Sequence, residues 1–403
     1  MTLILPSETA SSSTGPAEVR LEVRRLCKIF ADDPRPALSL LEAGAGKAEV
    51  LRRLNVNVGV VDASFDIRAG EIFVIMGLSG SGKSTMVRLL NRLIEPSRGE
   101  IRLDGRDLTR LPKRELVEVL RRDMSMVFQS FALLPNRTAL ENAAFGLEVA
   151  GVGKAARRAA ALRALEQVGL GAYAGRYPRE LSGGMQQRVG LARALAKNPT
   201  IMLMDEAFSA LDPLIRAEMQ NELLRLQREQ ARTIVFISHD AEEAMRIADR
   251  IAVMEDGRIV QIGTPAEILR EPADEYVRAF FRGVDSSRVL RARDLARCDA
   301  ATVLLDEADD RRPALRRLSE LGAGYGYVRD RAGRFRGVLS RDGADLLDGV
   351  EPAAGDAPVH ALLRRVATAP CPLPVVDGQG VFLGVVSRAA LLETLDRGSL
   401  GDG

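Results

Sequence analysis

The stretch "EIFVIMGLSGSGKST", residues 71–85, joins an apolar, β-branched run to a loop rich in glycine and serine. The loop fits the pattern G-x-x-x-x-G-K-[ST], and the amphipathic helical run "STMVRLLNRLI" continues from it. Glycines at 77, 80 and 82 let backbone N–H groups turn inward around a triphosphate, and the helix N-terminus adds the positive end of its dipole. The stretch therefore predicts a strand, a phosphate-binding loop and a helix, in the order that nucleotide binding requires.

Two side chains of this loop have specific predicted roles. Lys83 reaches the terminal phosphates as a compact cation, and Ser84 offers its hydroxyl to Mg²⁺. Only six of the 57 cationic residues are lysines, at positions 28, 47, 83, 113, 154 and 197, so a lysine here is informative. The residues predicted to bind the nucleotide are Gly77, Ser79, Gly80, Ser81, Gly82, Lys83, Ser84 and Thr85.

Acidic and polar residues at the ends of other apolar runs predict a hydrolytic site. "TIMLMDE", residues 200–206, ends in Asp205, expected to hold Mg²⁺ through water, and Glu206, expected to act as general base on the attacking water. Gln129 ends "DMSMVFQ" and is expected to reach the metal and the water. His239 ends "TIVFISH", where its imidazole can contact the γ-phosphate and hold Glu206. The predicted catalytic residues are Glu206, His239 and Gln129, and the predicted Mg²⁺ ligands are Ser84, Gln129 and Asp205.

The region from about Leu21 to Arg282 alternates apolar runs with helical patterns. The runs are "EIFVIM", "DMSMVFQ", "TIMLMD", "TIVFIS" and "RIAVME", and the helical patterns cover residues 83–94, 184–197 and 213–230. Strands that alternate with helices favour a parallel, doubly wound sheet, because each parallel connection needs a crossover. The expected fold class is α/β.

The composition excludes several classes of protein. The 57 Lys+Arg against 55 Asp+Glu leave a net charge of +2, so no cationic excess calls for nucleic acid. Three scattered cysteines, Cys27, Cys298 and Cys371, lack metal-binding spacing and are expected to be core residues in a reducing compartment. The start has no basic segment typical of a signal peptide, and no run is apolar enough to span a membrane. We expect a protein that is soluble, or peripheral on a membrane partner.

"LSGGMQQR", residues 181–188, holds two glycines between a serine and a helical run, and it has no group that could act on a substrate. Ser182, Gly183 and Gly184 would give that helix N-terminus a hydroxyl and bare backbone amides, which makes a second phosphate-binding element. One nucleotide needs only one phosphate-binding loop. The second element makes sense if it closes over the nucleotide of another copy.

With this element, the chain resembles the ATP-binding cassette (ABC) ATPases over about residues 21–283. The family's motifs occur here in the family's order. They are the phosphate-binding loop at 77–85 (Walker A, or P-loop), Gln129, LSGGMQQR, the acids Asp205 and Glu206 (Walker B), "SALD" (209–212) and His239. The resemblance implies a P-loop NTPase cassette, with a parallel-sheet core and antiparallel β and helical subdomains, that binds ATP and Mg²⁺. It also implies a head-to-tail homodimer in which each ATP lies between the P-loop of one copy and Ser182–Gly184 of the other, with Asp212 contacting the opposing subunit.

The resemblance further implies that Phe30, in "LCKIF", stacks on the adenine. An insertion at about 31–56 then precedes "VGVVDASF". The insertion, "GEIFVIMGLSGSGKSTMVRLLNRLIEP" and "MVFQSFALLPNRTALENAAFGLE" are similar to ATPase subunits of glycine betaine, proline and choline importers, the quaternary-amine family. The implied partners are an integral membrane permease and a periplasmic or lipid-anchored solute-binding protein, with no nucleic acid. The implied location is the cytoplasmic face of the bacterial inner membrane.

The sequence beyond Val284 repeats itself. "VRDRAGRFRGVLSR" (328–341) and "VVDGQGVFLGVVSR" (375–388) share V-x-D-x-x-G-x-F-x-G-V-[LV]-S-R at an offset of 47 residues, which predicts two copies of one supersecondary unit. The pair resembles tandem CBS motifs, which implies an α+β regulatory domain that responds to a cyclic dinucleotide or to ionic conditions. Gly343 and Ala390 stand where the CBS pattern has a ribose-binding acid.

These patterns together predict the domain organisation. We expect a disordered segment at 1–19, an ABC ATPase domain at 20–283 with the insertion at about 31–56, and a tandem CBS-like domain at 284–403 with repeats at about 290–348 and 356–398. Two alternatives stay open: an ATPase subunit of an importer for another small solute, such as methionine or a sugar, and a non-transport ABC ATPase that acts on ribosomes or DNA. The single cassette and the lack of long heptads count against the second alternative.

Overall fold

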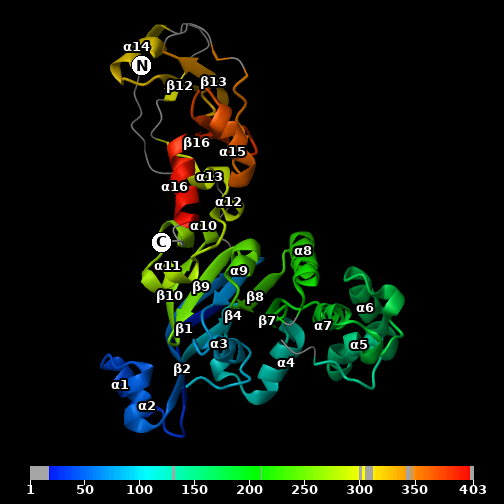
Figure 1. Ribbon diagram of the computed structural model, residues 1–403. Helices are drawn as coiled ribbons and strands as arrows, with labels where there is room; N and C mark the ends of the chain where they lie inside the picture. The colour runs from blue at the N-terminus through cyan, green and yellow to red at the C-terminus, as the bar shows by residue number, and fades with distance from the viewer. Residues whose placement is uncertain are drawn as a thin grey trace. The chain divides into compact units, whose positions relative to one another are not determined.

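The computed structural model describes residues 18–128, 132–209, 211–298, 302–304, 312–341, 346–347 and 349–399 of the 403-residue chain (Figure 1). Their contacts divide the chain into two compact units. The first runs to Asp240 and includes Ile247–Ile262, and the second consists of Ala241–Arg246 and the chain from Gly263 onward.

The first unit is built on a six-stranded sheet with the strand order β10-β9-β3-β8-β7-β6. Parallel pairing joins β3 to β8 and β9, and β7 to β6 and β8, which confirms the predicted parallel sheet. Every residue of β3 is buried, as expected for a strand covered on both faces. The bounds are β3 (Ile72–Met76), β6 (Met124–Val127), β7 (Ile201–Asp205), β8 (Thr233–Ser238), β9 (Arg250–Glu255) and β10 (Arg258–Gly263).

An antiparallel sheet with the order β2-β1-β4-β5 shares the core of this unit. Phe65 of β2 stacks on Phe73 of β3, with ring centroids 5.4 Å apart, so one hydrophobic core serves both sheets. β1 begins at Val19, which pairs with Arg68, so Val19 is an exception to the disorder predicted for 1–19; residues 1–17 lie outside the described ones. The bounds are β1 (Val19–Phe30), β2 (Asn57–Arg68), β4 (Arg98–Leu103) and β5 (Arg106–Asp107).

Helices complete the first unit and confirm the predicted cassette architecture. The helices α5, α6 and α7 pack on one another as a helical subdomain, and Thr138 and Glu141 form a capping box at the start of α5. The side chain of Asn142, fully buried, donates to three backbone carbonyls of the loop before α5 and fixes its path. The bounds are α3 (Lys83–Leu90), α4 (Lys113–Asp123), α5 (Ala139–Val149), α6 (Lys154–Gln167), α7 (Gly183–Ala196) and α8 (Pro213–Gln230).

The insertion folds as two short helices, α1 (Arg35–Glu42) and α2 (Lys47–Leu54). Their apolar positions Ala37, Leu41 and Val50 form a cluster of buried side chains with Ile29 and Val58 of the antiparallel sheet. The insertion therefore packs on the strands that flank it, and it follows Phe30 at the end of β1 directly.

The second unit contains two three-stranded sheets, β11-β12-β13 and β14-β15-β16. In each, the first strand runs parallel and the third antiparallel to the middle one, so the two repeats have the same topology. Phe335 N donates to Gly380 O and Phe382 N to Gly333 O, both at 2.9 Å, which relates the repeats by a local two-fold. The bounds are β11 (Thr302–Leu304), α14 (Arg312–Glu320), β12 (Tyr325–Arg329), β13 (Phe335–Ser340), β14 (Ala353–Ala354), α15 (Val359–Thr368), β15 (Leu373–Val376), β16 (Phe382–Val386) and α16 (Arg388–Ser399).

Short helices precede these repeats, and some belong by contact to the second unit although the motifs placed them in the cassette. Ala266 and Leu269 pack against the core formed by the second repeat. Residues 263–283 therefore belong to the second unit, whereas the sequence predicts domains at 20–283 and 284–403. Cys27 and Cys371 are buried, whereas Cys298 is exposed, so the core position expected for Cys298 is wrong. The bounds are α9 (Ala241–Ile247), α10 (Pro265–Arg270), α11 (Glu275–Phe280), α12 (Ser286–Val289) and α13 (Ala292–Leu295).

Candidate nucleotide-binding and hydrolysis site

The loop between β3 and α3 has the backbone that the glycines predict. Gly77, Gly80 and Gly82 have φ angles of +151°, +82° and +105°, a region that side chains rarely adopt. A Cβ added at Gly77 would collide with the carbonyl oxygen of Met254, and one at Gly82 with that of Gly59. Backbone presses on the outside of the loop, so only glycine fits at these two positions.

Lys83 is held inside the loop that it serves. Its Nζ donates to Gly77 O at 2.8 Å and to Leu78 O at 3.0 Å, and the residue is only 5% exposed. Burial lowers the pKa of Lys83, while the nearby charges of Glu206 and Asp205 oppose that shift. A bound phosphate would supply the anionic partner that the two carbonyls replace only in part.

Ser84 and Asp205, both predicted to bind the metal, form a hydrogen bond with each other. Ser84 Oγ donates to Asp205 Oδ1 at 3.3 Å, and burial raises the pKa of the Asp205 carboxyl. A half-buried carboxylate beside a hydroxyl is the hard-oxygen donor set that suits Mg²⁺ with phosphate and water as further ligands. Gln129, the third predicted ligand, lies outside the described residues.

Glu206 and His239 also meet, as predicted. His239 Nδ1 lies 3.5 Å from Glu206 Oε1. Glu206 has a φ of +45°, a left-handed conformation that is held by a bond from its N–H to Ile237 O and by the Ser209 N–H and hydroxyl donating to its carbonyl. The general base predicted from sequence is therefore fixed in position by the backbone and lies beside an imidazole.

The LSGGMQQR motif begins α7 with the cap that the sequence suggests. Ser182 Oγ accepts from Met185 N at 3.3 Å, and Asp212 caps α8 in the same way, accepting from Ile215 N at 3.1 Å. A Cβ on Gly184 would lie 2.6 Å from Ile215 Cγ2, so the first turns of α7 and α8 touch where Gly184 has no side chain. Gly183 is the first residue of α7.

Phe30 lies near the helix that follows the P-loop. A Cβ on Gly59 would lie 2.8 Å from Thr85 Cγ2 and 3.0 Å from Phe30 Cε2. The edge of the Phe30 ring and the Thr85 methyl group can lie this close to the backbone because Gly59 has no side chain. Phe30 is 47% exposed, and Lys28 Nζ lies 5.3 Å from the ring centroid. An exposed ring beside Thr85 is suited to stacking on a base.

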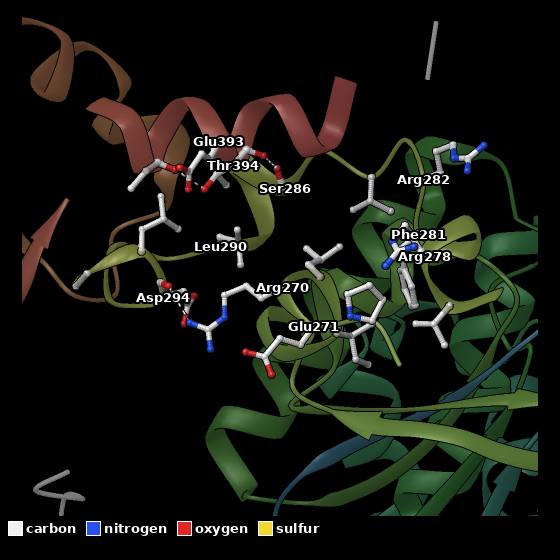
Figure 2. A pocket seen from close by; sticks show the side chains of 18 of the residues that line it. Arg270, Glu271, Arg278, Phe281, Arg282, Ser286, Leu290, Asp294, Glu393 and Thr394 are labelled. Carbon is white, nitrogen blue, oxygen red and sulfur yellow. Dashed lines mark hydrogen bonds between the residues drawn. The ribbon is translucent and has the colours of Figure 1, made fainter. Parts of the chain in front are cut away.

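A cavity of about 860 Å³ in the second unit was not predicted from the sequence (Figure 2). It is lined by residues of α10 to α13 and of α16. Some of its polar groups pair with one another: Arg270 donates to Asp294 O, and Arg297 forms an ion pair with Glu393 at 3.2 Å. No motif marks this cavity, because it forms where α16 packs near helices α10 to α13, which lie much earlier in the sequence.

Comparison with known proteins gives matches over the cassette and beyond it. Residues 60–209 match the ABC transporter family. The chain is 54% identical over 394 residues to the "Glycine betaine/proline betaine transport system ATP-binding protein ProV" of Salmonella typhimurium, covering 94% of this chain and 98% of that one. It is 47% identical over 389 residues to the "Glycine betaine transport ATP-binding protein OpuAA" of Bacillus subtilis, covering 94% and 92%.

Solved structures of ATP-binding cassettes also resemble this chain. The "Dimeric structure of a post-hydrolysis state of the ATP-binding cassette MJ0796 bound to ADP and Pi" has a TM-score of 0.52 and 31% identity, covering 61% of this chain and 98% of that one. The sequence relatives match most of the chain, so their likeness includes the second unit. The solved cassette matches a smaller share.

Proposed function

Because this chain belongs to the glycine betaine transport ATP-binding proteins of the ABC transporter family, we propose that it hydrolyses ATP to energise import of a compatible solute. The solute class is glycine betaine, proline betaine or choline, and it passes through a separate membrane permease. The observation that carries the proposal is the meeting of Lys83, Ser84 with Asp205, and Glu206 with His239 at one edge of the parallel sheet.

Each residue has a distinct part in hydrolysis. The P-loop amides and Lys83 hold the phosphates, and Ser84 and Asp205 hold Mg²⁺, which supplies charge stabilisation of the leaving phosphate. Glu206 accepts a proton from the attacking water, and His239 keeps Glu206 in place. Gln129 is proposed to join the metal and water. Phe30 stacks on the adenine.

Two copies act together. Ser182, Gly183 and Gly184 of one copy close over the nucleotide bound to the P-loop of the other, with Asp212 at the same interface. The partners are an integral permease and a periplasmic or lipid-anchored solute-binding protein, at the cytoplasmic face of the inner membrane. Among the described residues, no helix combines the length and apolar character needed to cross a bilayer.

The second unit is proposed to regulate the cassette. Its two repeats are CBS motifs that respond to ionic conditions or to a cyclic dinucleotide. In the second repeat, Ser387 Oγ accepts from Ala390 N at 3.1 Å, so the hydroxyl caps α16 and Ala390 offers no carboxylate for a ribose. Gly343, the equivalent position of the first repeat, lies outside the described residues. The second repeat thus lacks the acid that binds ribose in the CBS pattern. Sensing of ionic conditions does not require that acid.

The test is ATP hydrolysis by the full-length chain and by Glu206→Gln. We expect Glu206→Gln to bind ATP while hydrolysing it at least ~100-fold more slowly, because only the attacking water needs the base. The control is Glu118→Gln, which removes an exposed carboxylate from α4 and should leave the rate unchanged. Turnover by Glu206→Gln within a few-fold of the parent would remove Glu206 from this role. Transport of radiolabelled betaine by the reconstituted complex then tests the solute class.

A further inference from the structure

Arg216, near the start of α8, joins two loops that carry residues proposed for hydrolysis. Its Nη1 donates to Asp240 Oδ2 at 3.1 Å, and its Nη2 donates to the carbonyl oxygens of Ser209 and Leu211, each at 3.4 Å. Asp240 follows His239 directly in the sequence. One guanidinium therefore bonds the backbone of the SALD segment and the loop that follows β8.

The first of these loops is also bonded to the proposed general base. The N–H and the hydroxyl of Ser209 donate to the carbonyl oxygen of Glu206, at 3.1 and 2.9 Å. The same segment ends in Asp212, which caps α8 and is proposed to lie at the interface with the second copy. A side chain that holds Ser209 therefore acts on the backbone of Glu206 and on the interface segment together.

The second loop carries the imidazole that lies beside the base. Ser238 Oγ accepts from Asp240 N at 3.0 Å, so His239 lies within a hydrogen-bonded turn. His239 Nδ1 is 3.5 Å from Glu206 Oε1. The distance between these two side chains depends on how the two loops lie relative to each other, and Arg216 bridges the loops.

The surroundings of Arg216 differ from those of a surface ion pair. Its side chain is 29% exposed and that of Asp240 is 34% exposed. The Nε of Arg216 is buried, and no acceptor in the described part of the chain bonds it. An unpaired buried N–H costs free energy, which the three bonds of the other two nitrogens offset. A planar guanidinium can reach a carboxylate and two carbonyls at once, a geometry that the compact ammonium of lysine does not match.

We propose that Arg216 is a positioning residue for ATP hydrolysis, which sets the place of Glu206 relative to His239 by bonding the loops that carry them. This inference rests on the proposed hydrolysis at that site. It also connects the two-copy interface with the chemistry, because a movement of the Asp212 segment when the copies close is passed through Arg216 to the loop of His239. Since Arg216 acts on these loops and not on the phosphates, ATP binding should not need it.

The test measures the rate of ATP hydrolysis and, separately, ATP affinity by calorimetry, in the full-length chain. We expect Arg216→Met to lower kcat by about 10- to 100-fold, the scale for a misplaced catalytic group, while ATP affinity changes by less than about twofold. Arg216→Lys keeps the charge beside Asp240 but not both carbonyl bonds, so its kcat should fall between those of Arg216→Met and the parent. Arg228→Met changes an exposed arginine of the same helix and is the matched control, with the kcat of the parent.

Two double variants separate positioning from a general loss of structure. Asp240→Asn weakens the same bridge from its other end, so adding it to Arg216→Met should cost little further activity. In the Glu206→Gln protein, Arg216→Met should leave the residual rate nearly unchanged, because the base through which Arg216 acts is already absent. A merely structural role would lower the rate by the same factor with and without Glu206.

A kcat like that of the parent in Arg216→Met would overturn the inference, as would a loss that is the same in the Glu206→Gln background, or weaker ATP binding at unchanged kcat. If thermal unfolding shows that Arg216→Met does not fold, Asp240→Asn decides. A lower kcat at unchanged ATP affinity in that variant supports the inference, and a parental kcat overturns it. If the parent hydrolysed no more ATP than Glu206→Gln, the proposed function would fail and this inference with it.

Discussion

Asp205 and Glu206 are neighbours in sequence, yet the backbone separates their tasks. Asp205 ends β7 and lies beside Ser84, whereas the left-handed φ of Glu206 brings its carboxylate to His239. A left-handed conformation costs about 1–2 kcal/mol for a residue with a side chain, and the hydrogen bonds of Glu206 to Ile237 and Ser209 offset that cost. A metal ligand and a general base can therefore occupy adjacent positions.

Burial raises the pKa of the Asp205 carboxyl, so we expect its ionised form to lower the stability of the nucleotide-free protein. The native state then binds that proton more tightly than the unfolded state does, so stability from this group falls as pH rises through the raised pKa. We expect Asp205→Asn to raise the unfolding free energy at neutral pH by the order of 1 kcal/mol, while abolishing the extra stabilisation by Mg²⁺ with ATP.

Urea unfolding at a series of pH values from neutral downward checks this prediction, since the gain should shrink as the carboxyl of the parent becomes protonated. Asp356→Asn changes an exposed carboxylate in the second unit and is the control. A less stable Asp205→Asn protein at neutral pH would show that the carboxylate stabilises the fold even without a metal.

Residue positions at strand ends could be predicted from the sequence, and those set by the insertion could not. Asp205 ends β7 and His239 follows β8. The carboxyl ends of these parallel strands share one edge of the sheet, so the proximity of the two residues follows from the fold class. Lys47 lies beside Gly257 because Val50 and its neighbours pack the insertion on the antiparallel sheet. No local sequence pattern encodes that packing.

At the scale of elements, α7 and α8 present their N-termini side by side. Ser182 and Asp212 cap them, and Gly184 allows the first turn of α7 to lie against Ile215. The two helix ends therefore touch, and the Ser182 cap, which takes up Met185 N, leaves the amides of Gly183 and Gly184 at the start of α7 available to a phosphate. In the proposed dimer, the start of α7 faces the phosphates of the nucleotide held by the second copy.

We expect ATP to dimerise the Glu206→Gln protein, because each site takes its second wall from the other copy. Ser182→Arg should block dimerisation by placing a long side chain against the phosphates, while ATP binding to the P-loop of the monomer persists. Ser182→Ala, which loses only the cap and about 1 kcal/mol of stability, should still dimerise. Light scattering with and without ATP measures this, and monomeric Glu206→Gln protein at saturating ATP would contradict the two-copy site.

The strands of the cassette could be predicted closely, but the extent of the second unit could not. Runs such as "TIVFIS" became β8 because parallel strands buried on both faces need continuous apolar residues. Helices α10 and α11 follow the last cassette strand without a linker signal, and the α10 side chains of Ala266 and Leu269 pack on the core of the second repeat. Motif order alone therefore placed the boundary later than the contacts do.

At the scale of the whole molecule, all the described residues proposed to bind or hydrolyse ATP belong to the first unit. The second unit is held together by its own two-fold core, in which Phe382 stacks on Tyr327 and packs against Phe335, with ring centroids 5.6 and 6.1 Å apart. Its exposed ion pairs, such as Arg336 with Asp330, are screened by salt. Contacts made by such exposed charges weaken as the salt concentration rises.

We expect a chain that ends near Val284 to keep ATP hydrolysis within a few-fold of the full-length protein, and to lose its dependence on ionic strength in the assembled transporter. The Debye length, about 8 Å at physiological salt, shrinks as ions concentrate. Contacts made by the charged tail, the residues beyond Val284, should therefore weaken when a cell loses water. Because Leu269 and Val277 would lose neighbours from the tail, thermal unfolding must first show that the shortened chain is folded. Transport in liposomes over a range of internal salt is the measurement, and identical responses of the two proteins would exclude the tail as the sensor.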